Sequence, residues 1–213
     1  MHGSSTRIEA LRRWLGTPHC ALCQLHPAAQ ATAPLCAGCA EDLPWRCESI
    51  IVQTLSIQVA FAYGWPIDRV IHRYKYQGEL QMMPILAAGL RRLARPDVDA
   101  LLAVPLAPSR LRERGFNQSH ELAKQLSAHW QMPLLTGIER RSGVQQQGLK
   151  RSERLLNLQG AFSIRAGTVL PRRVALLDDV LTTGSTLLHL VDLLHSHGVA
   201  EVSAVVVASS KRG

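Results

Sequence analysis

In the second half of the chain, short apolar runs alternate with segments whose apolar residues recur at helical spacing. The apolar runs predict buried strands at residues 100–106, 132–138, 161–164, 172–180 and 201–209, with 161–164 as an edge strand. The helical segments are 119–129 and 185–197, and Gly198 is a suitable C-cap for the second. Strands that alternate with helices predict an α/β fold with a parallel sheet covered on both faces.

Before this alternation, residues 56–63 read as a strand and residues 68–76 and 79–95 as helices, and 95–97 interrupt the chain. Residues 7–15 form a short amphipathic pattern that charged residues interrupt, unlike a signal peptide. No stretch approaches the ~20 apolar residues of a membrane span. We therefore expect a cytoplasmic protein without a membrane-spanning helix.

All five cysteines lie between Cys20 and Cys47, in a segment with little apolar periodicity. Four of them form two CxxC pairs separated by twelve residues, namely Cys20, Cys23, Cys36 and Cys39. This spacing predicts a zinc ribbon in which four thiolates hold a structural Zn²⁺. Metal binding, of order 10–16 kcal/mol, would replace the core that so small a segment lacks. Two disulfides or a redox-active CxxC are the alternatives.

The cysteines divide the chain into two expected domains. Residues 1–50 would hold the N-terminal helix and the cysteine module, and residues 51–213 the α/β domain. The net charge of +8 and pI of about 9.8 favour phosphorylated ligands or nucleic acid as partners. An arginine-rich surface without such a partner explains the charge equally well.

The segment VALLDDVLTTGST (174–186) carries the most specific chemistry. An apolar strand ends in Asp178 and Asp179, and a turn before the next helix supplies Thr182, Thr183, Gly184, Ser185 and Thr186. Hydroxyls, free amides and the helix N-terminus favour a phosphate there, while the carboxylates suit ribose hydroxyls or a cation. Ordinary helix capping is the alternative. The segment resembles the phosphoribosyl pyrophosphate (PRPP) signature of type I phosphoribosyltransferases, in which substrate-bound Mg²⁺ joins the site.

Two basic segments are candidates for the pyrophosphate end. AVPLAPSRLRERGFNQS (103–119) carries Arg110, Arg112 and Arg114 after the first strand of the alternation, where arginines can neutralise a pyrophosphate. The polar segment 140–157 includes Gln147 and Arg154 and corresponds in position to the mobile loop of those transferases. A solvated basic loop and a disordered linker are the respective alternatives.

The whole pattern resembles the ComF family of competence-associated bacterial proteins, also called GntX-like. The resemblance rests on the double CxxC and on YKYQGE (74–79), RERGFNQ (112–118), QGLKRSERLLNLQGAF (147–162) and LLDDVLTTGST (176–186). It implies a type I phosphoribosyltransferase-like fold, an N-terminal zinc ribbon and a link to DNA uptake. It makes Lys75 a candidate pyrophosphate ligand, although a surface lysine is the alternative. Val144 stands where the family commonly has Thr, which puts a substrate role of that position in doubt.

Two functions fit these patterns. In the first, the protein is a phosphoribosyltransferase in which Asp178 and Asp179 are catalytic and a nucleophile displaces pyrophosphate from PRPP. In the second, it is a non-catalytic PRPP-sensing or DNA-handling module that acts with single-stranded DNA or a competence helicase or translocase. The fold cannot decide between them, and no sequence pattern describes an acceptor pocket.

Overall fold

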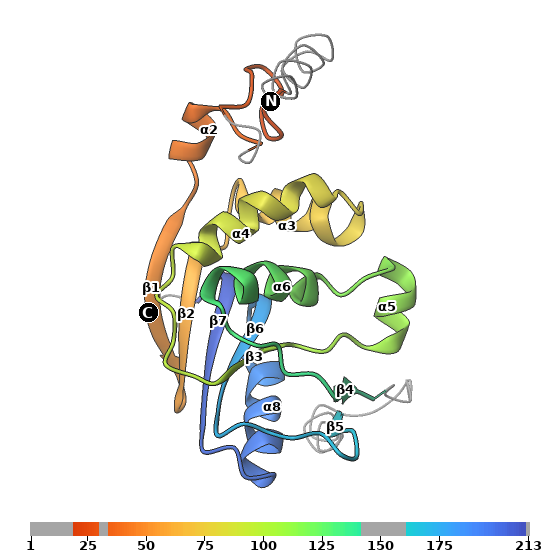
Figure 1. Ribbon diagram of the computed structural model, residues 1–213. Coiled ribbons are helices and arrows are strands. Elements are labelled where there is room, and N and C mark those ends of the chain that lie inside the picture. The colour runs from red at the N-terminus through yellow and green to blue at the C-terminus, as the bar shows by residue number, and fades with distance from the viewer. Residues whose placement is uncertain (1–18, 30–33, 142–160, 212–213) are drawn as a thin grey trace, which may run out of the picture.

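The computed structural model describes residues 19–29, 34–141 and 161–211 and contains a five-stranded sheet with the order β1-β2-β7-β6-β3 (Figure 1). Its strands are β1 (Trp45–Val52), β2 (Leu55–Ala62), β3 (Ala100–Ala103), β6 (Arg173–Leu181) and β7 (Glu201–Ser209). All neighbouring pairs are parallel except β1–β2, which is an antiparallel hairpin. The predicted parallel sheet is therefore confirmed, with an added antiparallel edge strand that the hydrophobic pattern did not indicate.

Helices cover both faces of this sheet. One face packs against α3 (Ile67–Tyr76), α4 (Met83–Arg91) and α6 (Gln118–Trp130), and the other against α8 (Ser185–Ser196) and the small β4 (Ile138–Arg140)–β5 (Phe162–Ile164) hairpin. Because side chains alternate along a strand, Leu177 lies in the first core and Leu176 in the second. Each such side chain, once buried, stabilises the fold by about 1.5–3 kcal/mol.

Some predicted elements differ from the observed ones. The predicted strand at 132–138 is wrong: a single bridge joins Leu134 to Leu101, and the strand begins only at Ile138. Pro133 cannot donate to a ladder, and Gly137 adopts a φ of +89°, so regular pairing is interrupted. The predicted helix at 79–95 is a 3₁₀ turn η1 (Leu80–Met82) followed by α4, which ends at Arg91.

The sequence pattern indicates no helix in the basic segment directly after β3, but this segment contains the short helix α5 (Pro108–Arg114). Pro108 suits the first helical position because the amide it lacks would have had no partner there. Gly115, with a φ of +78°, ends the helix in the left-handed conformation. The arginines of this segment therefore lie on a helix that leads directly into α6.

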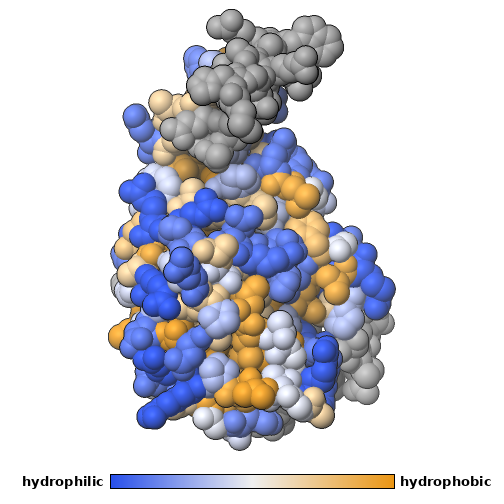
Figure 2. Space-filling model, viewed as in Figure 1, coloured by the Kyte–Doolittle hydropathy of each residue, from blue (hydrophilic) through white to orange (hydrophobic). Residues whose placement is uncertain are grey.

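The cysteine module lies at one end of the molecule, where α2 (Ala37–Glu41) begins directly after Cys36 and contains Cys39, the second cysteine of the same CxxC pair (Figure 1). β1 begins at Trp45, within the range that the sequence assigned to this module, and joins it to the main sheet. Hydrophobic and hydrophilic residues are interspersed over the face seen in Figure 2. Within the described ranges, none of the helices has both the length and the apolar character needed to cross a bilayer.

Candidate functional site

The acidic pair lies near the end of β6, where residues from two helices meet it. Asp178 Oδ1 accepts hydrogen bonds from Ser119 Oγ at 3.1 Å and from the amide of Asp179 at 2.9 Å. The other carboxylate, Asp179, forms an ion pair with Lys75 in which Nζ lies 2.7 Å from Oδ1. The structure thus brings together the end of α3, the start of α6 and the end of β6. Such a junction at the carboxyl edge of a parallel sheet is where α/β folds bind ligands.

The two carboxylates affect each other's ionisation. Burial, and then the neighbouring charge of Asp179, raise the pKa of Asp178 from 3.8 to about 7. The amide of Asp179, the Lys75 ammonium and the Ser119 hydroxyl act in the opposite direction without cancelling this rise. Asp178 therefore titrates near neutral pH, and its ability to accept hydrogen bonds changes in that range.

The hydroxyl-rich turn connects β6 to α8. The side chains of Thr182, Thr183 and Ser185 are exposed, and Thr183 Oγ1 lies 3.0 Å from Ser185 Oγ. One amide of the turn, that of Ser185, already donates to Thr183 Oγ1 at 3.3 Å. The first hydrogen bond of α8 runs from the amide of Leu188 to the carbonyl of Gly184. The amides before Leu188 therefore have no acceptor within the helix backbone and can donate to a ligand.

Gly184 has to be glycine in this turn. Its φ is +85°, a conformation that other residues rarely adopt. A Cβ at this position would also lie 3.2 Å from Val52 Cγ1, at the end of β1. The hydroxyls and amides of the turn therefore depend on a backbone conformation that only a residue without a side chain adopts easily.

Two residues at this site were not assigned from the sequence. Ser119 is the last residue of the basic segment 103–119 and lies in the first turn of α6, which Asn117 caps. This position brings its hydroxyl to Asp178. Lys211 donates from Nζ to the carbonyl of Thr183 at 2.8 Å, and its own carbonyl accepts from Arg46. No sequence pattern indicated Lys211, because its contact is set only by the way β7 ends beside β6.

The predicted pyrophosphate residues lie in different environments. Arg114 is half-buried, lies over the ring of Tyr76 with Cζ 4.8 Å from the centroid, and donates to Gln118 Oε1 at 3.1 Å. Arg110 and Arg112 are exposed on α5, where Arg110 contacts Glu113 at 3.7 Å. Lys75 lies against Asp179, as described above. Gln147 and Arg154 lie outside the described residues.

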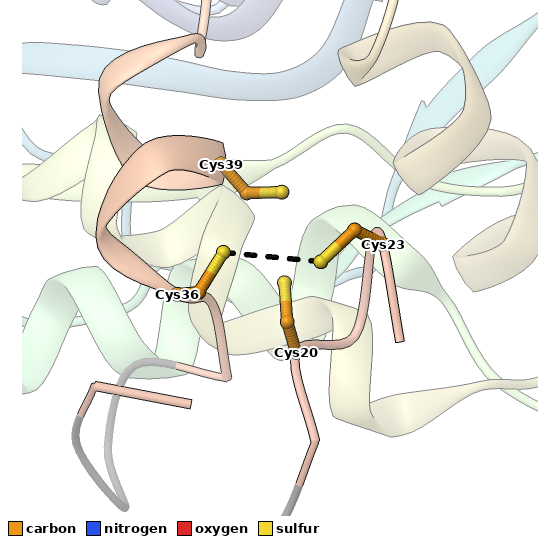
Figure 3. A group of neighbouring side chains, drawn as sticks. All are labelled: Cys20, Cys23, Cys36 and Cys39. Carbon is orange, nitrogen blue, oxygen red and sulfur yellow. Dashed lines mark hydrogen bonds between the residues drawn. The ribbon is translucent and has the colours of Figure 1, made fainter. Parts of the chain in front are cut away.

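The four cysteines of the two CxxC pairs converge on one point (Figure 3). Their sulfur atoms all lie within 4.8 Å of one another, and Cys23 Sγ is 3.8 Å from Cys36 Sγ. A tetrahedral zinc site with Zn–S bonds of about 2.3 Å requires sulfur atoms about 3.8 Å apart. The four side chains therefore form a cluster of the size that a tetrahedral metal ion needs.

The local backbone favours thiolates at this cluster. Although burial opposes ionisation of Cys20, the amides of Cys23, Cys36 and Leu22 lower its pKa to about 6. The amides of Leu25 and His26 lower the pKa of Cys23, while burial and the neighbouring sulfurs raise that of Cys39. A divalent cation is what allows four adjacent thiols to ionise together, so this donor set fits a metal ion.

The comparisons with known proteins agree with this fold. The family model described as "Phosphoribosyl transferase domain" matches residues 111–213, which include the acidic pair and the hydroxyl-rich turn. The chain therefore has the type I phosphoribosyltransferase-like fold, a mixed but mainly parallel sheet flanked by helices.

The relatives extend over most of the chain. Competence protein F of Haemophilus influenzae is 35% identical over 79% of this chain and 82% of that protein. Competence protein ComFC of Streptococcus pneumoniae is 28% identical over 79% and 73%, and DNA utilization protein YhgH of Salmonella typhimurium 30% identical over 87% and 80%. The chain belongs to the ComF family.

Proposed function

We propose that this protein binds PRPP with its acidic pair and hydroxyl-rich turn, and acts as a phosphoribosyltransferase-type protein in the handling of incoming DNA. The observation that carries the proposal is the junction of an exposed Thr/Ser turn with two carboxylates that neighbouring helices hold in place. The turn would bind the 5-phosphate through the hydroxyls of Thr182, Thr183, Ser185 and Thr186 and through the amides at the start of α8. Gly184 allows the close approach of the phosphate.

The carboxylates would take the sugar. Asp178 and Asp179 have oxygen atoms that can accept hydrogen bonds from the two ribose hydroxyls, and Mg²⁺ bound to the substrate would supply charge compensation for the pyrophosphate. When a nucleophile displaces pyrophosphate from the anomeric carbon, positive charge develops on the ribose, and nearby carboxylates stabilise it. Lys75 contacts Asp179, and Arg114 donates to Gln118 at the start of α6, next to Ser119; we propose that these two cations face the departing pyrophosphate.

We further propose that the cysteine cluster holds Zn²⁺ with Cys20, Cys23, Cys36 and Cys39 as ligands. Four thiolates leave no open position on the ion, so its role is structural. None of the five cysteines is disulfide-bonded, which suits the reducing cytoplasm that the sequence suggested. In this proposal residues 1–50 form the metal-dependent module and residues 51–213 the PRPP-binding domain.

A crystal soaked with PRPP and magnesium tests the placement. The proposal requires phosphate density within hydrogen-bond distance of the turn and a ribose against Asp178 and Asp179. A ligand bound elsewhere would overturn the assignment. Turnover is tested separately by pyrophosphate release with a panel of bases, with Asp179→Asn as the inactive reference.

A second candidate function is a non-catalytic PRPP-sensing or DNA-handling module. The net charge of +8 and the relatives' names, competence protein and DNA utilization protein, favour a role beside nucleic acid. Tight PRPP binding without pyrophosphate release under any condition would favour this function over the transferase. If single-stranded DNA binds electrostatically, its affinity should fall steeply with salt, and no binding at low salt would exclude it. Capture of a helicase or translocase partner by the wild type and not by Cys20→Ser would assign that contact to the cysteine module.

A further inference from the structure

Arg73 of α3 makes direct contact with the first CxxC pair. Its Nη1 donates to the carbonyl of Ala21 at 2.7 Å, and Ala21 lies between Cys20 and Cys23. This hydrogen bond joins the backbone of the cysteine cluster to a helix of the α/β domain.

Glu79 fixes the guanidinium that makes this contact. Arg73 Nε donates to Glu79 Oε1 at 3.0 Å and Nη2 to Oε2 at 2.6 Å, which is a two-point, planar arrangement. Gln81 Nε2 also donates to Glu79 at 2.9 Å. The hydrogen bonds from Arg73 lower the pKa of Glu79, so this carboxylate stays charged and keeps the guanidinium aimed at Ala21.

The same helix contacts the acidic pair two residues later, where Lys75 binds Asp179 at 2.7 Å. Residues two apart on an α-helix are separated by about 200° around its axis, so the two side chains leave α3 on opposite sides. Tyr74 between them is fully buried and packs against Phe116 at 5.5 Å. This helix is therefore fixed in the core, with the cysteine cluster on one side and the acidic pair on the other.

We propose that Arg73 is a positioning residue that couples metal binding at the cysteine cluster to ligand binding at Asp178 and Asp179. The inference rests on the proposed metal and PRPP sites. A metal ion orders the backbone around Ala21, which holds Arg73 and, through α3, sets Lys75 against Asp179. Because coupling between two binding sites is reciprocal, a ligand at the acidic pair strengthens metal binding by the same factor.

A second attachment of the cysteine module provides a matched control. Trp45 Nε1 donates to the carbonyl of Ala40 in α2 at 3.3 Å, and its ring lies 4.8 Å from Phe61 and 4.3 Å from Arg92 Cζ. These contacts join the module to β2 and α4 and do not involve Lys75 or Asp179. The test variant is Arg73→Gln, and Arg92→Gln is its matched control because it removes one positive charge at the module's other attachment. We expect Arg92→Gln to leave the coupling intact.

The test measures zinc transfer from the full-length, zinc-loaded protein to a chelator, with and without PRPP in excess magnesium. We expect PRPP to slow the transfer about 5–10-fold in the wild type and in Arg92→Gln. In Arg73→Gln the two rates should agree within about twofold, and Arg73→Lys should recover part of the difference. PRPP in solution can itself bind zinc and change the measured rate. The Asp179→Asn variant, which should bind PRPP weakly, measures this effect so that it can be subtracted.

Equal rates with and without PRPP in the wild type, or an undiminished difference in Arg73→Gln, would overturn the coupling. Calorimetry on the same samples separates this failure from a failure of the proposed function. If the wild type binds neither zinc nor PRPP, the sites themselves are wrong. If it binds both and the rates do not respond, the coupling through Arg73 is wrong and the two sites stand.

Discussion

The cysteine module and the α/β domain of this chain differ in how many buried apolar side chains each contains. Strands and helices of the α/β domain enclose two aliphatic cores, in which residues such as Leu176 and Leu190 are fully buried. Between residues 19 and 44, the buried residues within the described ranges are Cys20, Leu35, Cys36 and Leu43, so half of them belong to the proposed metal-ligand set. Hydrophobic burial accounts for the α/β domain, whereas the few buried residues of the module add little to the first core, and we propose that the module depends on its cysteines.

The largest effect should come from removing one thiolate of the cluster. We expect Cys36→Ser to lose the bound metal and to unfold the module, because apparent metal-binding free energies of about 10–16 kcal/mol are lost with the site. Elemental analysis and hydrogen exchange over residues 19–44 would measure both changes. Cys47→Ser is the control, since Cys47 lies outside the cluster. Full metal content in Cys36→Ser would contradict the predicted ligand set.

A cavity in the α/β core should have the next largest effect. Leu176→Ala removes a fully buried side chain and should lower the free energy of unfolding by about 2–5 kcal/mol, with no change in metal content. Chemical denaturation measures this loss. Leu80→Ala, at a position that is 57% exposed, should change stability by less than about 0.5 kcal/mol. Equal effects of the two substitutions would argue against the described core.

At the ligand site, removing one negative charge should be costly for binding and mild for folding. Asp179→Asn loses the ion pair with Lys75 and a charged acceptor for ribose, so PRPP affinity should fall about 10–100-fold, as expected for one charge-assisted hydrogen bond. Titration calorimetry gives the affinity. Asp192→Asn, on the exposed part of α8, should bind like the wild type. An unchanged affinity in Asp179→Asn would remove this carboxylate from the site.

The last effect concerns pH and arises in the α/β domain. Burial and Asp179 raise the pKa of Asp178 from 3.8 to about 7, so the folded state binds more protons than the unfolded state between these values. The free energy of unfolding should therefore fall as pH rises from about 4 to about 7, and this contribution should be constant above that range. Asp178→Asn should remove the contribution in denaturation measured across this range. A wild-type curve with the same slope as the variant would contradict it.

Some of this molecule could be read directly from its sequence. Residues 174–186 combine a long apolar run with turn chemistry, so β6, the turn and α8 were predicted close to their observed bounds. The cysteine spacing likewise predicted the cluster that the structure forms. β1 was missed because the polar residues Arg46, Glu48 and Ser49 interrupt its apolar pattern. The strand is also irregular: Cys47 has a φ of +45°, and the pairing with β2 shifts between Trp45 and Glu48.

Contacts between distant segments could not be predicted from one sequence. Nothing local to Lys75 indicates that it meets Asp179, because only the packing of α3 on the sheet brings them together. The same holds for Lys211 at the turn and for Arg73 at the cysteine pair. Sequence patterns therefore located the chemical groups, and the tertiary fold decided which of them act together.

Titration calorimetry of the full-length protein with PRPP and magnesium tests the central claim most directly. The account predicts one site per chain, competition by ribose 5-phosphate, and weaker binding in Thr183→Val, which removes the hydroxyl that lies 3.0 Å from Ser185 Oγ. Absence of binding, or binding that neither ribose 5-phosphate nor Thr183→Val affects, would contradict it.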